Sequence, residues 1–258
     1  MTSTTPQSNG VITAISLIGL IVFWTVLAWL KADPTVLPTP LEVWHIARAE
    51  AASGELARHM IATIWRVAAA FGLAMTLGLI IGFAMGRNQT LDRWFGAWLV
   101  VFLNIPALVV IVLCYLWIGL NETAAIVAVA LNKTAMVAVT IREGTRALDP
   151  QLEDMAHSFG MKRGTHFWHV VLPQLWPFIA SSTRNGLAII WKIVLVVEFL
   201  GRSDGIGFQI HLYFQLFEIG YVMAYAFSFV LFILALEWTV INLFEKRATK
   251  WRLAPGQI

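Results

Sequence analysis

The sequence has little charge, because only 13% of its 258 residues are Asp, Glu, Lys or Arg. A soluble domain usually carries about 25%, so this composition is not that of an ordinary water-soluble protein. Cysteine is almost absent: Cys114 is the single one, which excludes an intrachain disulfide and argues against a thiol-ligated metal. Residues 1–10 contain no Lys or Arg, so the N-terminus lacks the basic region of a cleavable signal peptide.

Signatures of several enzyme classes are missing as well. The chain contains no G-x-x-x-x-G-K-[ST] loop for binding nucleotide, no H-E-x-x-H and no G-x-S-x-G. No histidine in the central apolar segments is placed to activate Ser181 or Ser182. We therefore expect no catalytic residue, no metal site and no cofactor in this chain. A membrane-embedded enzyme and an ATP-independent channel are the alternatives to the transport function argued below.

Apolar residues are abundant: they make up 59% of the chain and gather in long segments. A helix needs about 20 mostly apolar residues to cross a bilayer. We therefore predict an all-α integral membrane protein with about six transmembrane helices. The expected spans are 11–30, 60–85, 94–120, 123–141, 175–200 and 221–243.

These segments suggest one transmembrane domain, 11–245, between a flexible tail, 1–10, and a cytoplasmic tail, 246–258. Between the first two spans, the prolines at 34, 38 and 40 stop a helix. Leu41 and Trp44 then begin a helical repeat, which predicts an amphipathic helix on the membrane surface.

The distribution of Lys and Arg predicts the orientation of the chain. If the N-terminus is cytoplasmic, the cytoplasmic segments carry ten of these residues and the outer segments carry four. Cytoplasmic loops carry the excess of positive charge in membrane proteins. We therefore expect both termini, and the polar segment 149–173, to lie in the cytoplasm.

Segment 149–173 has the features of a helical hairpin between two spans. Asp149-Pro150 is a typical helix start. Gly160 is expected to end this first helix in a left-handed or closely approached conformation. A second short helix should end at Leu172-Pro173 and return the chain to the bilayer. One apolar ridge is expected on the first helix, formed by Leu148, Leu152, Met155 and Phe159.

The hairpin also has the spacing of a known motif, written E-A-A, three residues, G, nine residues, I-x-L-P. The matching positions are Asp154, Met155, Ala156, Gly160, Val170, Leu172 and Pro173. Asp154 replaces Glu, Met155 replaces Ala and Val170 replaces Ile. The pattern resembles the EAA motif of permease subunits of bacterial binding-protein-dependent ABC importers.

Two further stretches resemble the branch of this family that imports nitrate, sulfonates, taurine and related compounds. They are Leu37-Pro38-Thr39-Pro40, and Glu198-Phe199-Leu200-Gly201 with Gly205-Ile206-Gly207. The resemblance implies the type I permease fold and a small, often anionic solute such as a sulfonate, nitrate, taurine or an aromatic acid. Related permeases accept thiamine-precursor pyrimidines, so the solute stays open.

The resemblance also implies a role for the hairpin and a set of partners. The hairpin would insert into a cleft on a separate ATPase subunit, of which two copies bind ATP and Mg. A second permease copy and a soluble substrate-binding protein are implied, in the bacterial inner membrane and without nucleic acid. The residues implied in ATPase coupling are Asp154, Met155, Ala156, Phe159, Gly160, Leu172 and Pro173.

Polar residues inside the apolar segments need a reason, because a charge at mid-helix costs about 2.5 to 3.5 kcal/mol on insertion scales. We expect Arg66, Arg184 and Glu198 to lie near helix ends and reach the interface. Lys133 and Lys192 lie nearer the centre, and either face a cavity or pair with Glu198 or another helix. The candidates for the transport pathway are Lys192, Arg184, Lys133 and Asn104.

Proline and glycine predict how the helices pack. Pro106 interrupts the third segment, so that helix is either buried against others or broken beside a pathway. Glycines at 72, 78, 82 and 86 include three at four-residue spacing. This ridge of small residues predicts a close helix contact.

Overall fold

The computed structural model describes residues 7–31 and 33–249, and every regular element in these ranges is helical. The predicted all-α fold is confirmed. The elements are α1 (Gln7–Lys31), α2 (Pro40–Ser53), α3 (Glu55–Arg87), α4 (Gln89–Asn104), α5 (Ala107–Ile118), α6 (Glu122–Arg146), α7 (Pro150–Ser158), α8 (Arg163–His166), the π-helical turn η1 (Phe167–Val171), α9 (Leu172–Gly201), α10 (Ile206–Gln215) and α11 (Ile219–Thr249).

Length and composition single out four helices in the described chain that could cross a membrane. They are Ile12–Lys31, Glu55–Arg87, Glu122–Arg146 and Ile219–Leu236. The pair α4 and α5 makes a fifth span if it crosses as one unit. Helix α9, expected as another span, is 30 residues long but carries Arg184, Lys192 and Glu198 and does not meet the same criterion.

The segment expected over 94–120 is broken at Pro106. Helices α4 and α5 meet at an angle of 98°. Pro106 disfavours a helical conformation at the residue before it, and Ile105 is extended, with φ −72° and ψ 123°. Pro106 then caps the start of α5. The broken helix that the sequence left open is therefore the one observed.

Helices α3 and α6 are in close contact through the predicted glycine ridge. A Cβ atom added at Gly78 would lie 2.5 Å from Val137, and one at Gly82 would lie 2.5 Å from the carbonyl oxygen of Ala138. Any larger residue would therefore separate the two helices. Helix α9 packs on α6 beside this pair, and α5, α10 and α11 complete the described core.

Helix α2 lies where the surface helix was expected. Thr39 caps its start, accepting a hydrogen bond from the backbone N–H of Glu42, whose carboxylate accepts one from the backbone N–H of Thr39. Leu41 and Trp44 are exposed, and Val43 is the residue that packs inward. This capping box explains why threonine precedes the helix and glutamate stands three residues later.

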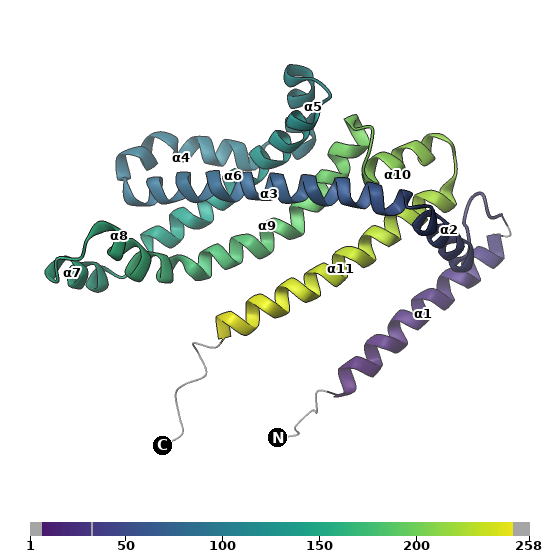
Figure 1. Ribbon diagram of the computed structural model, residues 1–258, viewed down its shortest axis with the longest axis horizontal. Helices are drawn as coiled ribbons and strands as arrows, with labels where there is room; N and C mark the ends of the chain where they lie inside the picture. Colours follow the sequence, from purple (N-terminus) through teal and green to yellow (C-terminus); the bar gives the residue numbers. More distant parts are fainter. Residues whose placement is uncertain (1–6, 32, 250–258) are drawn as a thin grey trace.

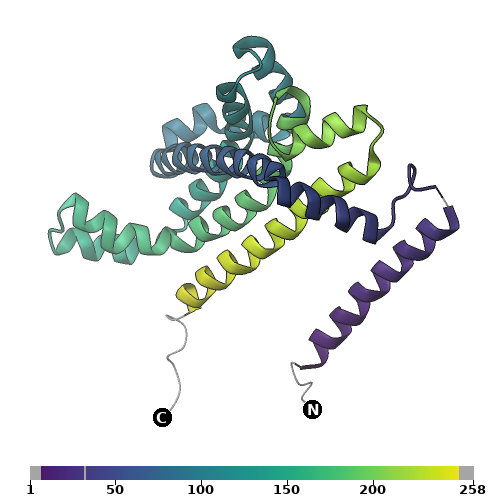
Figure 2. The ribbon, with the colours of Figure 1, turned by 45° about the vertical axis from the view of Figure 1, so that its right-hand side comes forward.

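The start of α1 and the end of α11 lie on the same side of the structure. In Figures 1 and 2, the start of α1 and the end of α11 point away from α2 and α10. The elements α7 and α8 form one end of the bundle, here called the hairpin end, and α10 lies at the opposite end. Helix α1 begins at Gln7 and α11 ends at Thr249, so the rest of the expected tails, 1–6 and 250–258, lies outside the described residues.

Candidate functional site

The first helix of the hairpin has the caps that its sequence predicts. The side chain of Asp149 accepts a hydrogen bond from the backbone N–H of Gln151 at 2.8 Å. At the other end Gly160 has φ 61°, which confirms the left-handed conformation. Its N–H donates to His157 O and the next N–H, of Met161, donates to Ala156 O, both at 3.0 Å. This pair of bonds is a Schellman cap, which explains glycine at this position.

The second half of the hairpin differs from the prediction. The chain does not end a helix at Leu172-Pro173; it runs from α8 through η1 directly into α9. Pro173 lies in the first turn of α9, where its missing N–H is tolerated. The N–H of Leu172 donates to Phe167 O, five residues earlier, which is the wide turn of a π-helix. The hairpin and α9 are therefore joined by continuous helix.

The four residues of the predicted apolar ridge differ in burial. Leu148 is buried against Val171 and Leu175, so it belongs to the core and not to an outer ridge. Leu152 and Met155 are 38% and 39% exposed, and Phe159 is 79% exposed. Of the other coupling candidates, Asp154 and Pro173 are exposed, Ala156 is buried and Leu172 is half-buried. The outer surface of the hairpin is thus Leu152, Met155 and Phe159, with Asp154 beside them.

One ion pair ties the hairpin to α3. The Arg87 guanidinium donates two hydrogen bonds to the Glu153 carboxylate, at 2.7 and 3.0 Å. These bonds lower the pKa of Glu153. The same guanidinium lies 5.8 Å from the centre of the Phe83 ring, which meets Phe167 edge to face. The sequence reasoning missed this contact, although Arg87 ends a span and Glu153 adjoins the motif.

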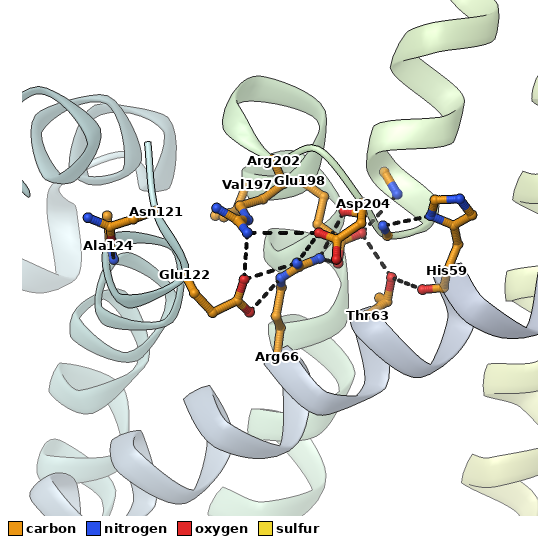
Figure 3. Close-up of polar contacts among 12 residues, drawn as sticks. His59, Thr63, Arg66, Asn121, Glu122, Ala124, Val197, Glu198, Arg202 and Asp204 are labelled. Atoms are coloured by element: carbon orange, nitrogen blue, oxygen red, sulfur yellow. Dashed lines mark hydrogen bonds and ion pairs between the residues drawn. The ribbon is translucent and has the colours of Figure 1, made fainter. Parts of the chain in front are cut away.

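At the opposite end, a partly buried ionic cluster joins α3, α6 and α9 (Figure 3). Arg66 is 3% exposed and donates to three carboxylates: Glu198 at 2.7 Å, Glu122 at 2.8 and 3.0 Å, and Asp204. Glu198 is fully buried. Arg202 also pairs with Glu122, at 2.8 Å. We refer to these five residues as the ionic cluster.

The cluster corrects two expectations about charged residues. Arg66 and Glu198 were expected at helix ends facing the interface, but both are buried and bonded to each other. Glu198 was also a possible partner for Lys133 or Lys192, and it has Arg66 instead. Each residue was visible as a charge in an apolar segment. Their pairing was not, because 132 positions separate them.

The loop after α9 is bound to α3 by its backbone. The N–H of Gly205 donates to His59 Nδ1 at 3.0 Å, and the N–H of Ile206 donates to Thr63 Oγ1 at 2.9 Å. The N–H of Gly207 donates to Glu198 at 2.9 Å. A Cβ atom at Gly205 would overlap the Glu198 carboxylate, so the close approach requires glycine.

The four pathway candidates lie in three places. Lys192 and Arg184 are exposed on α9, and Lys133 is buried on α6. Asn104 is exposed at the end of α4, where its side chain donates to Val100 O at 2.7 Å. Lys192 shares a face of α9 with other uncovered residues, namely Ser181, Asn185, Ile189 and Val196, which recur every three or four positions. Arg184 flanks this face, which we call the α9 face.

The comparisons identify the family. The family described as binding-protein-dependent transport system inner membrane component matches residues 74–250. The chain belongs to this family. It is therefore a multi-pass membrane protein, a permease subunit of an ABC importer.

Named relatives and a solved structure agree with this assignment. The chain is 30% identical to the putative aliphatic sulfonates transport permease SsuC of Bacillus subtilis, over 90% of this chain and 84% of the relative. It is 26% identical to the taurine transport system permease TauC of Escherichia coli, over 90% and 86%. A crystal structure of an amino acid ABC transporter with histidines covers 78% of this chain and 97% of its own, with a TM-score of 0.61 and 24% identity. This last likeness shows the fold.

Proposed function

We propose that two copies of this chain form the pathway of an ATP-driven importer for a small organic anion of the sulfonate class. A soluble binding protein delivers the anion, and two ATPase subunits bind ATP and Mg. The names of the sulfonate and taurine relatives support the substrate class. The observation that carries the proposal is the α9 face. Lys192 lies on this face and Arg184 flanks it, and the described part of the chain leaves both exposed.

The charge on the α9 face argues for a watery pathway. A cation facing lipid at mid-helix would cost about 2.5 to 3.5 kcal/mol. That cost disappears if the face borders water between two copies of the chain. There, a positive side chain lowers the cost of removing water from a passing anion without holding it in a closed cage.

The hairpin is the proposed contact with the ATPase. Met155 and Phe159 present apolar surface that the described part of this chain does not cover, on a short helix with its ends capped. A short helix with an apolar ridge suits a groove on a soluble partner. Since α8 and η1 continue into α9 and a short turn at Gly160 joins α7 to α8, a movement of the hairpin by the ATPase reaches the α9 face.

Transport by reconstituted vesicles tests the pathway. The complex with its ATPase is inserted in vesicles and supplied with binding protein and taurine or ethanesulfonate. We expect Lys192→Met to lower ATP-dependent uptake while ATPase co-purification stays unchanged, because the variant removes charge only from the pathway. Lys192→Arg should retain uptake, and Ile189→Met on the same face is the neutral control. Normal uptake by Lys192→Met would assign Lys192 to structure, and uptake without ATP would indicate a passive channel.

Cysteine labelling tests the proposed orientation, in which the hairpin and both termini are cytoplasmic. In a Cys114→Ser background, single cysteines are placed at Arg163 in α8 and at Ser203, both exposed. Ser203 is preferred to Arg202, because Arg202 belongs to the ionic cluster. An impermeant maleimide should label only position 203 in intact cells. Labelling of position 163 would reverse the orientation.

A further inference from the structure

Lys133 is a buried cation without a carboxylate partner in the described chain. It lies in α6, is 2% exposed and forms none of the ion pairs found there. Its Nζ atom lies 2.7 Å from Sδ of Met136, a weak hydrogen-bond acceptor. Arg66, equally buried, meets three carboxylates. A buried ammonium group with no better acceptor than a thioether sulfur raises the free energy of the folded state unless a negative charge lies beside it.

A second polar group is left without a partner on the helix that faces Lys133. Ser182 in α9 is 4% exposed, and its Oγ atom has no hydrogen-bond partner. An unmade hydrogen bond at a buried hydroxyl costs about 1 to 3 kcal/mol. A serine or threonine hydroxyl in a helix can donate to the carbonyl oxygen four residues earlier, as Thr134 does to Ala130 O in α6. The bare Ser182 hydroxyl is therefore a donor in need of an acceptor.

The two groups lie on the same seam between α6 and α9. A Cβ atom at Gly186 would lie 3.6 Å from Cε of Lys133, so the lysine stem runs beside Gly186. Ser182 lies one turn from Gly186 on the same side of α9, toward the hairpin end. The contact of Lys133 with Met136 also leads toward the hairpin end, because α6 and α9 are antiparallel through the hairpin.

We propose that this seam is a binding site for a small oxyanion, in which Lys133 Nζ and Ser182 Oγ hold the oxygens of a sulfonate or carboxylate group. The ammonium supplies the charge that α6 otherwise lacks, and the anion supplies the acceptor that the Ser182 hydroxyl lacks. Lysine suits this task, since it has three donors and needs no planar partner. The inference rests on the proposed function, because it is the transported anion that reaches the site.

The position of the seam relative to the α9 face explains how the anion reaches it. Ser182 is about 60° around the helix from Asn185, which lies on the α9 face. An anion beside Lys192 therefore moves about 10 Å along the α9 face to Asn185 and then steps sideways around the helix. Both donors are covered in this structure, so the step occurs as α6 and α9 separate. Gly186 has no side chain to block the anion where it enters the seam beside Lys133.

Binding to the purified complex without binding protein tests the site directly. The permease with its ATPase is titrated with ethanesulfonate, acetate, nitrate and sulfate, and the dissociation constant of each is measured. Lys133→Met should weaken binding by about tenfold or more, and Ser182→Ala by about threefold to tenfold, as expected for bonds to a charged and a neutral donor. Lys31→Met, at an exposed position at the end of α1, is the matched control and should leave equilibrium binding unchanged, because it removes a positive charge outside the seam.

The outcomes separate this inference from the proposed function. If the wild-type complex shows ATP-driven uptake but binds none of the four anions, or binds them equally after both substitutions, the seam is not an anion site and the importer stands. If the variants lose binding while the wild type shows no ATP-driven uptake, the site stands and the proposed function fails. Ser182→Ala removes one atom from the seam, so it answers the question even if Lys133→Met does not fold.

Discussion

The ionic cluster and the outer surface of the hairpin, at opposite ends of the bundle, differ in whether this chain alone satisfies them. At the end away from the hairpin, the buried charges of Arg66 and Glu198 are bonded to each other, and Arg66 also meets the partly exposed Glu122 and Asp204. At the hairpin end, apolar side chains such as Phe159 are left uncovered by the same chain. The ionic cluster is satisfied within this chain, whereas the outer surface of the hairpin is one that a partner can cover.

The difference has a physical basis. An ion pair inside a bundle is costly to assemble, but removing one partner is costlier still, because it leaves a buried charge alone. The ionic cluster therefore fixes the relative positions of α3, α6 and α9. An uncovered apolar ridge, in contrast, contributes little to the stability of this chain, because its apolar area leaves water only when a partner covers it. Variants at the two ends should accordingly fail in different assays.

The largest effect is expected at the ionic cluster. Arg66→Met leaves Glu198 fully buried without its counter-ion, which should destabilise the protein by about 3 to 5 kcal/mol. The thermal unfolding of the purified complex measures it. The double variant Arg66→Met with Glu198→Met should recover part of the loss, because no buried charge remains between these two positions. Arg93→Met, at an exposed position in α4, is the control. Equal unfolding temperatures for Arg66→Met and the control would contradict the role of the cluster.

A smaller effect, on a different property, is expected at the hairpin. Phe159→Asp removes a side chain whose burial in a partner is worth about 1.5 to 3 kcal/mol, so docking of the ATPase should weaken by roughly ten- to a hundredfold. The unfolding temperature of the permease should not change, since Phe159 is 79% exposed in it. His157→Asp, on the other side of α7, is the matched control. Co-purification of the ATPase and flux per ATP hydrolysed are the measurements, and wild-type values of both would exclude the hairpin as the coupling element.

What the sequence could predict at each end follows from how far apart the interacting residues are. The hairpin's caps at Asp149 and Gly160 depend on neighbouring backbone groups, so residue type and spacing were sufficient. The glycine ridge on α3 was also predictable, because its repeat follows the helix period. The ionic cluster was not, since α3 and the end of α9 meet only in the folded chain. The angle at Pro106 and the π-turn before Pro173 likewise depend on packing, although each proline marked its place.

The smallest effect is expected at the contact between α3 and the hairpin. Hydrogen bonds from Arg87 lower the pKa of Glu153 from its ordinary 4.5, so this ion pair stabilises the hairpin at neutral pH and is lost as the pH falls through the lowered value. The pair is partly exposed, and its contribution should be only about 0.2 to 1 kcal/mol. Glu153→Gln should therefore speed hydrogen exchange of the α7 amides at neutral pH by about 1.5- to fivefold. Acidification should bring the exchange rate of the wild type toward that of the variant, and so should high salt, because salt screens a partly exposed ion pair.

Glu143→Gln is the control, because Glu143 pairs with Arg142 and not with the hairpin. If the α7 amides exchange equally fast in both variants at neutral pH, the edge contact of Phe83 with Phe167 holds the hairpin instead, and this end of the molecule, unlike the end with the ionic cluster, is fixed by apolar contact and not by charge.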